Sequence, residues 1–163
     1  MSKIDRTSFT LRVPVRASMT ALYKAWTSIS ELEHWFLRRA TATGLDGKQL
    51  KKAAKITEGC TYTWEWYGYD SMEEGRILKA NGKDHLRFTF AGGEVDVKLK
   101  KVGRQVVVEL VHGRIPTDDE SFKNIYIGCL RGWTFWLANL NSVYEGGLNL
   151  RNENTSLKGM LNN

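Results

Sequence analysis

The sequence offers few side chains whose types and spacing could support catalysis. Its three histidines, His34, His85 and His112, lie far apart, and none has a second ligand at the spacing of a metal site. Its two cysteines, Cys60 and Cys129, have no neighbouring base and are too few for a disulfide framework. We therefore expect packing or surface histidines, free buried thiols, no metal and no cofactor.

Acidic groups and nucleophile motifs point the same way. The chain has no Gly-x-Ser-x-Gly motif, and Gly92-Gly93 reads as a hairpin turn and not as a phosphate loop. Glu65, Asp96 and Glu109 fall in predicted strands, where alternation sends them to the outer face. Catalysis would require a polar side chain facing the interior, and the pattern identifies none. The sequence thus favours a binding protein over an enzyme.

Aromatic side chains are the main candidates for binding. Tyr62, Trp64 and Trp66 alternate along one predicted strand, and Phe88 and Phe90 alternate along another. Tyr and Trp combine an apolar body with a polar group, which would orient an amphipathic ligand. The same rings could instead fill the core, so the sequence leaves open whether they line a cavity or plug it.

A long helix must position these rings. From Thr117 to Gly147 apolar residues recur at helical spacing, which predicts about 28 residues and roughly 42 Å of helix at 1.5 Å per residue. Thr117 to Glu120 fits a capping box, and Gly146-Gly147 ends the pattern. The predicted apolar face comprises Phe122, Tyr126, Cys129, Leu130, Trp133, Trp136, Leu137, Leu140, Val143 and Tyr144.

The preceding residues predict one strand, two short helices and about six more strands. Phe9, Leu11 and Val13 alternate, helical patterns follow Ser18 and Ser30, and Ser30 to Glu33 fits a second capping box. Residues 38–50 read as a loop and residues 53–57 as a weak strand. Alternating segments separated by short turns indicate an antiparallel meander over residues 60–67, 75–80, 85–91, 94–101 and 105–112.

These elements define the fold class. A sheet with one apolar face must cover it, and only the long helix has enough apolar width. We therefore predict an α+β fold in which a curved antiparallel sheet of six to seven strands surrounds a long C-terminal helix, with two short helices after the first strand. Such an arrangement can leave a cavity between sheet and helix.

Bulk properties limit the possible partners. The 163 residues fit one domain, and 24 Lys and Arg against 18 Asp and Glu give a net charge of +6, which permits an acidic partner. The only basic cluster, residues 48–55, has no interleaved aromatics, so we do not expect nucleic-acid binding. No apolar run has the length of a signal peptide or a membrane span. We expect a cytoplasmic protein, either a monomer or a homodimer.

Several stretches, in this order, resemble the START-like (SRPBCC), birch-pollen-allergen-type superfamily of helix-grip proteins, and within it the activator of heat shock protein 90 ATPase homologue family. They are Val15 to Trp26, Glu31 to Phe36, Glu74 to Ile77 with His85 to Phe90, and Gly132-Trp133 with Leu137, Leu140 and Tyr144 to Gly146. Residues beyond Arg151 have no match, so we divide the chain into a domain of residues 1–151 and a polar tail of residues 152–163.

The resemblance implies a helix-grip fold with an apolar cavity whose entrance lies near Trp35. Members include lipid and polyketide binders and chaperone activators. Our leading hypothesis is a non-enzymatic protein that holds a small apolar or amphipathic, lipid-like or aromatic molecule between sheet and helix. The alternatives are a chaperone-interacting module and a cyclase or hydrolase. The candidate ligand-binding residues are Trp35, Tyr62, Trp64, Trp66, Phe88, Phe90, Val108, Tyr126, Cys129, Leu130 and Trp133.

Overall fold

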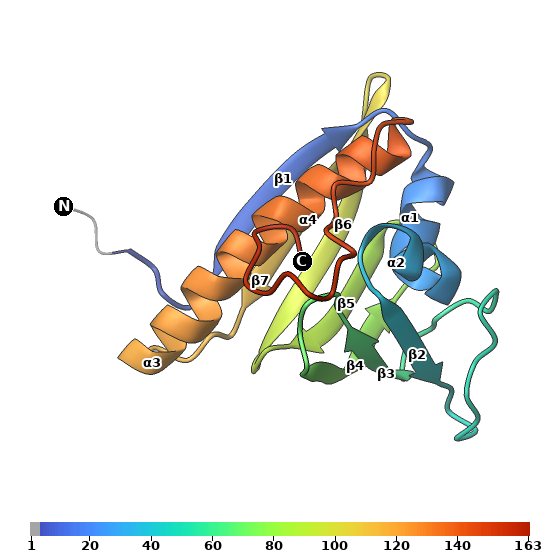
Figure 1. Ribbon diagram of the computed structural model, residues 1–163. Coiled ribbons are helices and arrows are strands. Elements are labelled where there is room, and N and C mark those ends of the chain that lie inside the picture. Colours follow the sequence, from blue (N-terminus) through green and yellow to red (C-terminus); the bar gives the residue numbers. More distant parts are fainter. Residues whose placement is uncertain (1–3) are drawn as a thin grey trace.

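A curved antiparallel sheet wraps around one long helix in the computed structural model, which describes residues 4–163 (Figure 1). The seven strands follow the order β1-β7-β6-β5-β4-β3-β2. This confirms the predicted α+β helix-grip fold. The elements are β1 (Phe9–Val15), α1 (Met19–Thr27), α2 (Ile29–Trp35), β2 (Arg39–Thr43), β3 (Thr61–Glu65), β4 (Met72–Ala80), β5 (His85–Phe90), β6 (Gly93–Val102), β7 (Gln105–Gly113), α3 (Asp119–Ser121), η1 (Phe122–Ile127) and α4 (Gly128–Tyr144).

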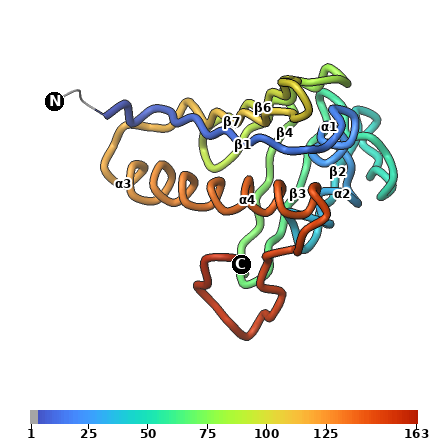
Figure 2. Tube along the Cα trace, turned by 90° about the horizontal axis from the view of Figure 1, so that it is seen from above, coloured from blue at the N-terminus to red at the C-terminus, as the bar shows by residue number. Residues whose placement is uncertain are grey.

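Strand alternation separates the two faces of the sheet as predicted. On β6 and β7, Val95, Val97, Val106, Val108 and Leu110 are buried, while the residues between them are more exposed. Because side chains alternate along a strand, this register turns one apolar face toward α4. Seen from above, α4 runs along that face, and the chain after it forms a separate loop (Figure 2).

The long helix forms where expected, but its start differs from the prediction. Asp118 caps it, because its side chain accepts a hydrogen bond from the Ser121 backbone N–H at 2.8 Å. The predicted capping box at Thr117 is therefore wrong by one residue. The residues of η1 then adopt a π-helix before α4 continues. No sequence pattern signals this wider turn, which depends on the surrounding packing.

Three further local predictions are wrong. Residues 39–43 form β2, paired with β3, where a loop was expected; small residues, Ala40 and Ala42, fill its buried positions and gave no strong apolar signal. Residues 53–57 form no strand, only an isolated bridge from Lys55 to Ser28. Glu33 makes no capping box, because its carboxylate accepts the Ala40 N–H at 2.9 Å and pairs with Lys52.

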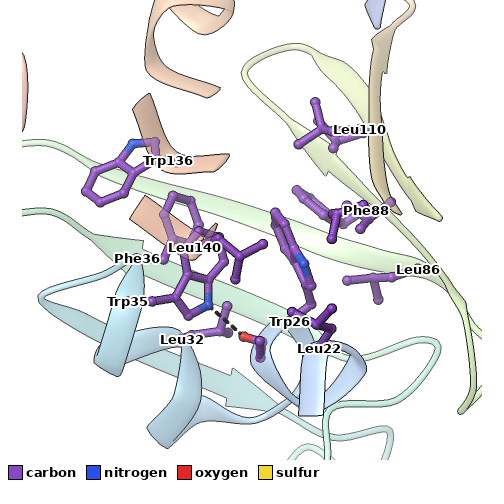
Figure 3. Close-up of a cluster of buried hydrophobic side chains, with 14 of the residues drawn as sticks. Leu22, Trp26, Leu32, Trp35, Phe36, Leu86, Phe88, Leu110, Trp136 and Leu140 are labelled. Atoms are coloured by element: carbon purple, nitrogen blue, oxygen red, sulfur yellow. Dashed lines mark hydrogen bonds between the residues drawn. The ribbon is translucent and has the colours of Figure 1, made fainter. Parts of the chain in front are cut away.

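Aromatic rings fill the centre of the molecule. Phe36, at the end of α2, is 1% exposed. Its ring centroid lies 5.0 to 5.5 Å from those of five other rings, Trp35, Trp64, Trp66, Trp133 and Trp136. The Trp35 indole N–H donates to the Ala25 carbonyl at 2.9 Å, the bond dashed in Figure 3. This cluster joins the short helices, the sheet and α4.

Tyr62 lies flat across the neighbouring strand. Its partner on β4 is Gly75, and an ideal Cβ there would lie 2.6 Å from the ring carbon Cε1 of Tyr62. The ring therefore requires a residue without a side chain beneath it. Across Gly75, the Tyr62 hydroxyl donates to the Thr89 carbonyl on β5. Burial raises the pKa of this hydroxyl well above its usual range, so it remains a donor.

We predict that Gly75→Ala lowers the free energy of unfolding by about 2–4 kcal/mol, since overpacking and loss of the Tyr62 hydrogen bond add. Urea denaturation would measure the change. Gly113→Ala on β7 is the matched control, because a Cβ there meets no atom closer than 3.9 Å. Similar small losses in both variants would contradict this role for Gly75.

Candidate functional site

A cavity of about 220 Å³ lies between the sheet and the N-terminal half of α4. Six of its thirteen lining residues are aromatic, and Arg131 is the one charged side chain in the lining. Two residues come from the segment after α4. The lining residues are Phe36, Trp66, Tyr69, Ser71, Phe90, Gly128, Cys129, Arg131, Gly132, Trp133, Trp136, Leu161 and Asn163.

Two other hollows differ in character. Each measures about 640 Å³, but among residues 4–163 one is lined by five residues, Ile4, Asp5, Arg6, Thr117 and Phe122. The other lies across the outer face of the sheet among mainly charged and polar side chains, including Asp84 and Lys98. Ligand pockets are usually concave, apolar and supplied with a few polar groups. The aromatic cavity is therefore the candidate site.

The structure brings four of the sequence-predicted residues, Trp66, Phe90, Cys129 and Trp133, into the cavity wall. Core positions are occupied by Trp35, Tyr62, Trp64, Phe88 and Val108, while Tyr126 and Leu130 are half-buried outside the lining. Ligand contact by these seven residues stays a prediction.

Sequence reasoning missed the residues that make the space. Gly128 and Gly132 lie inside a helix, where glycine costs about 1 kcal/mol relative to alanine. An ideal Cβ at either position meets no atom within 4 Å, apart from the neighbouring helix backbone. Their spacing of four residues inside a helical pattern was the available signal. Tyr69, Ser71, Leu161 and Asn163 carried no comparable signal.

The segment that follows α4 folds back onto the domain. The guanidinium of Arg151 donates to the carbonyls of Leu37 and His34, both at 2.8 Å. The buried Asn139 side chain donates to the Trp35 carbonyl at 2.6 Å and accepts the Leu150 N–H at 2.7 Å. These bonds anchor the chain beside α2 and direct the following residues toward the cavity.

Cys129 lines the cavity but is not activated as a nucleophile. Burial raises the pKa of its thiol to about 12, and the nearby Glu73 carboxylate raises that pKa further. Thiolate is the reactive form, so at neutral pH this cysteine is a protonated, inert wall residue.

Glu73 is an inward-facing carboxylate that the sequence reasoning did not find. The error came from starting the strand at Gly75, whereas β4 begins at Met72 and places Glu73 opposite the buried Trp64. Glu73 accepts the Ala91 N–H at 2.7 Å and has no basic partner within 4.0 Å among residues 4–163. It lies beside the cavity but is not part of its lining.

Two indole N–H groups in the cavity wall are buried and make no hydrogen bond. The indole N–H groups of Trp66 and Trp133 are buried without an acceptor. Both indoles pack against the Phe90 ring, with centroids 6.1 and 5.1 Å away. Ring faces accept N–H groups only weakly. The wall therefore offers a ligand mainly apolar contact.

His112 on β7 is a fully buried packing histidine. Its ring lies between Phe9 and Phe90, with centroid distances of 5.4 and 5.9 Å, and neither ring nitrogen makes a hydrogen bond of ordinary geometry. Burial lowers its pKa to about 4, opposed by the nearby Phe90 carbonyl. The ring is neutral at pH 7.

The other two histidines lie away from the core. His34 is exposed, and His85 Nε2 lies 2.6 Å from Asp96 Oδ1 on the outer face.

Neither a membrane span nor a metal centre is found in the described part of the chain. Within residues 4–163, every helix is too short or too polar to cross a bilayer. In the same range, no three His, Cys, Asp or Glu side chains come together in a group that could hold a metal ion.

A seven-stranded sheet gripping a long helix, with a cavity between them, defines a START-like helix-grip protein. Residues 16–145, most of the chain, match the model of the family described as Activator of Hsp90 ATPase homolog 1-like protein. The chain belongs to this family. No curated protein sequence matches it.

Solved structures share the fold at low sequence identity. A Staphylococcus saprophyticus protein superimposes with a TM-score of 0.70 at 15% identity, covering 88% of this chain and 96% of that one. The Aha1 dimer from Colwellia psychrerythraea gives 0.66 at 18% identity, with coverages of 86% and 97%. An Enterococcus faecalis protein of unknown function gives 0.64 at 16% identity, with coverages of 85% and 71%. At such identities the likeness shows the fold alone.

We predict that acid destabilises the protein through His112. Its pKa is about 4 when folded and 6.5 when free, so between these values the unfolded chain takes up a proton that the folded chain refuses. Stability from this group is fully present above pH 6.5 and falls as the pH drops toward 4. From pH 7.5 to 5 the loss should be about 2 kcal/mol.

Urea denaturation at both pH values would measure this loss. In His112→Leu the titrating group is gone, so its unfolding free energy should change less over the same interval. Identical pH slopes in the two proteins would contradict the assignment.

Proposed function

We propose that the protein binds a small, mainly apolar aromatic molecule in the cavity beside Trp133 and does not transform it. The wall of aromatic rings supports this, because such rings offer large contact areas and favour edge-to-face packing with another ring. A cytoplasmic location is part of the proposal.

Cavity size narrows the ligand class. Pockets for drug-sized ligands measure about 300–1,000 Å³. The space here, about 220 Å³, is below that range. It therefore suits a single small aromatic molecule better than an intact lipid with long acyl chains.

The observation that carries the proposal is the unfilled space at Gly132. A glycine within a helix is usually explained by the close approach of another element, but no atom lies within 4 Å of its ideal Cβ beyond the neighbouring backbone. The residue faces the cavity instead. We attribute its presence to the need for room for a ligand.

The proposal omits catalysis for chemical reasons. Cys129 remains a thiol, and Glu73, which is not part of the cavity lining, uses one oxygen to accept the Ala91 N–H. A cyclase or hydrolase would need a reactive group in contact with the bound molecule. Arg131, Tyr69 and Ser71 suit orientation of a polar substituent instead.

A chaperone-interacting role is the second candidate, supported by the description of the family. Lys98 and Lys100 are exposed on the outer side of β6, and neither has a carboxylate within 4.0 Å among residues 4–163. Such unpaired charges suit an acidic protein surface.

The Colwellia relative is described as a dimer, so we also propose a homodimer, to be tested by light scattering.

If the chaperone role holds, the protein should stimulate the ATPase of heat shock protein 90, and Lys98→Glu combined with Lys100→Glu should weaken that stimulation. Added salt should weaken it in the unmodified protein too, since exposed charges are screened. Absence of stimulation at low salt would remove this candidate.

We predict that filling the cavity from α4 weakens binding without unfolding the protein. Gly132→Leu should weaken binding of anilinonaphthalene sulfonate (ANS), an aromatic fluorescent probe, by about tenfold or more, equivalent to about 1.4 kcal/mol. Gly132→Ala should raise the free energy of unfolding by about 0.5–1 kcal/mol, because alanine favours the helix. ANS titration and urea denaturation measure the two effects.

Ala138→Leu is the matched control, since Ala138 is exposed on the same helix and lies outside the cavity lining. This variant should bind ANS like the unmodified protein. Unaltered ANS affinity in Gly132→Leu, or no ANS binding by the unmodified protein, would refute ligand binding at this site.

A further inference from the structure

We propose that residues 152–163, here named the closing segment, form a lid over the cavity, and that Leu161 and Asn163 set the largest ligand it admits. The inference rests on the proposed binding function. It concerns a part of the chain that lies outside the match to the family model, which ends at residue 145.

The closing segment supplies part of the cavity wall. Leu161 and Asn163 both line the space, although they lie far along the chain from the other lining residues. Figure 2 shows the chain after α4 as a loop whose end, in the closing segment, returns beside the turn between β3 and β4. Asn163 is only 4% exposed. Moving this segment would therefore widen the cavity.

Hydrogen bonds close the segment on itself at a narrow base. The Asn152 backbone N–H donates to the Asn162 carbonyl at 2.6 Å, and the Asn152 side chain donates to that of Asn163 at 2.7 Å. Immediately before this base, Arg151 is fixed to the carbonyls of α2. The segment can therefore move as one unit from a fixed point at Arg151.

Only weak contacts hold the far side of the closing segment. Its ion pair to the body, Lys158 to Asp70 at 3.2 Å, has side chains 53% and 97% exposed, so water and salt screen it strongly. Leu157, Met160 and Leu161 remain 47%, 41% and 68% exposed, so each leaves a large part of its apolar surface in water. Segments with few buried contacts open at low free-energy cost. The segment is thus closed on itself near Arg151 and only weakly held against the body on its far side.

Gly68 forms the seat for Asn163. It adopts a left-handed backbone conformation, with φ of +76°, in the turn between β3 and β4. An ideal Cβ at Gly68 would lie 2.6 Å from Cγ of Asn163. Any side chain at this position would therefore push Asn163 away from the cavity.

The test compares two glycines with the same backbone strain. Gly68→Ala should displace the closing segment, whereas Gly47→Ala carries equal strain at φ of +74° but meets no atom within 4 Å. We expect Gly68→Ala to speed hydrogen exchange of residues 152–163 and to raise the ANS association rate by about fivefold or more, since gate opening no longer limits entry. Gly47→Ala should change neither quantity.

The larger probe bis-ANS tests size selection. It should bind Gly68→Ala more tightly than the unmodified protein by about tenfold. Lys158→Glu should act in the same direction, and adding Asp70→Lys should restore the original rates by re-forming the ion pair. The lid proposal is refuted if Gly68→Ala shows faster hydrogen exchange in the closing segment but binds ANS and bis-ANS like the unmodified protein.

Failure of the binding function itself gives a different result. In that case, no variant and no unmodified sample binds ANS, whatever the hydrogen exchange of the closing segment. Equal hydrogen exchange in Gly68→Ala and Gly47→Ala, with ANS still bound normally, overturns the lid while leaving the proposed binding function in place.

Discussion

The packing of Phe36 against five tryptophan rings is the interaction on which the rest of the structure depends. Phe36 ends α2, Trp64 lies on β3, and Trp133 and Trp136 lie on α4, so a single ring connects elements that are remote in the sequence. Aromatic pairs at such distances each contribute about 0.5–1.5 kcal/mol beyond simple burial. The cluster fixes where α4 crosses the sheet, and the cavity is the space left beside that crossing.

The cavity exists because tight packing stops abruptly at one face of α4. Trp133 and Trp136 fill the space toward Phe36, whereas Gly128 and Gly132 present no side chain on the adjoining part of the helix. Protein interiors are close-packed, so an unfilled space of this size needs a reason. The proposed ligand binding would supply one, and it would also account for the glycines inside this helix.

Electrostatics separate the interior from the surface. Two titratable groups near the cavity are held in their neutral forms: Cys129 stays a thiol and His112 an uncharged imidazole, because burial disfavours their charged forms. The charged pairs that the structure contains lie mainly on the outer face, such as Arg87 with Asp96. An apolar interior and a basic exterior would place the proposed ligand binding and the proposed partner binding on different faces of the same domain.

The sequence by itself determined the fold class, the apolar face of the sheet and the long helix, because strand and helix periodicities depend on local spacing. It also identified Trp66, Phe90, Cys129 and Trp133, whose positions in the cavity wall follow from those periodicities. Tertiary structure alone decided that Glu73 faces inward, that Tyr62 lies over Gly75, and that Leu161 and Asn163 line the cavity. These features depend on where each strand begins, on ring packing across neighbouring strands and on contacts between distant segments. None of them produces a repeating pattern of apolar residues in the sequence.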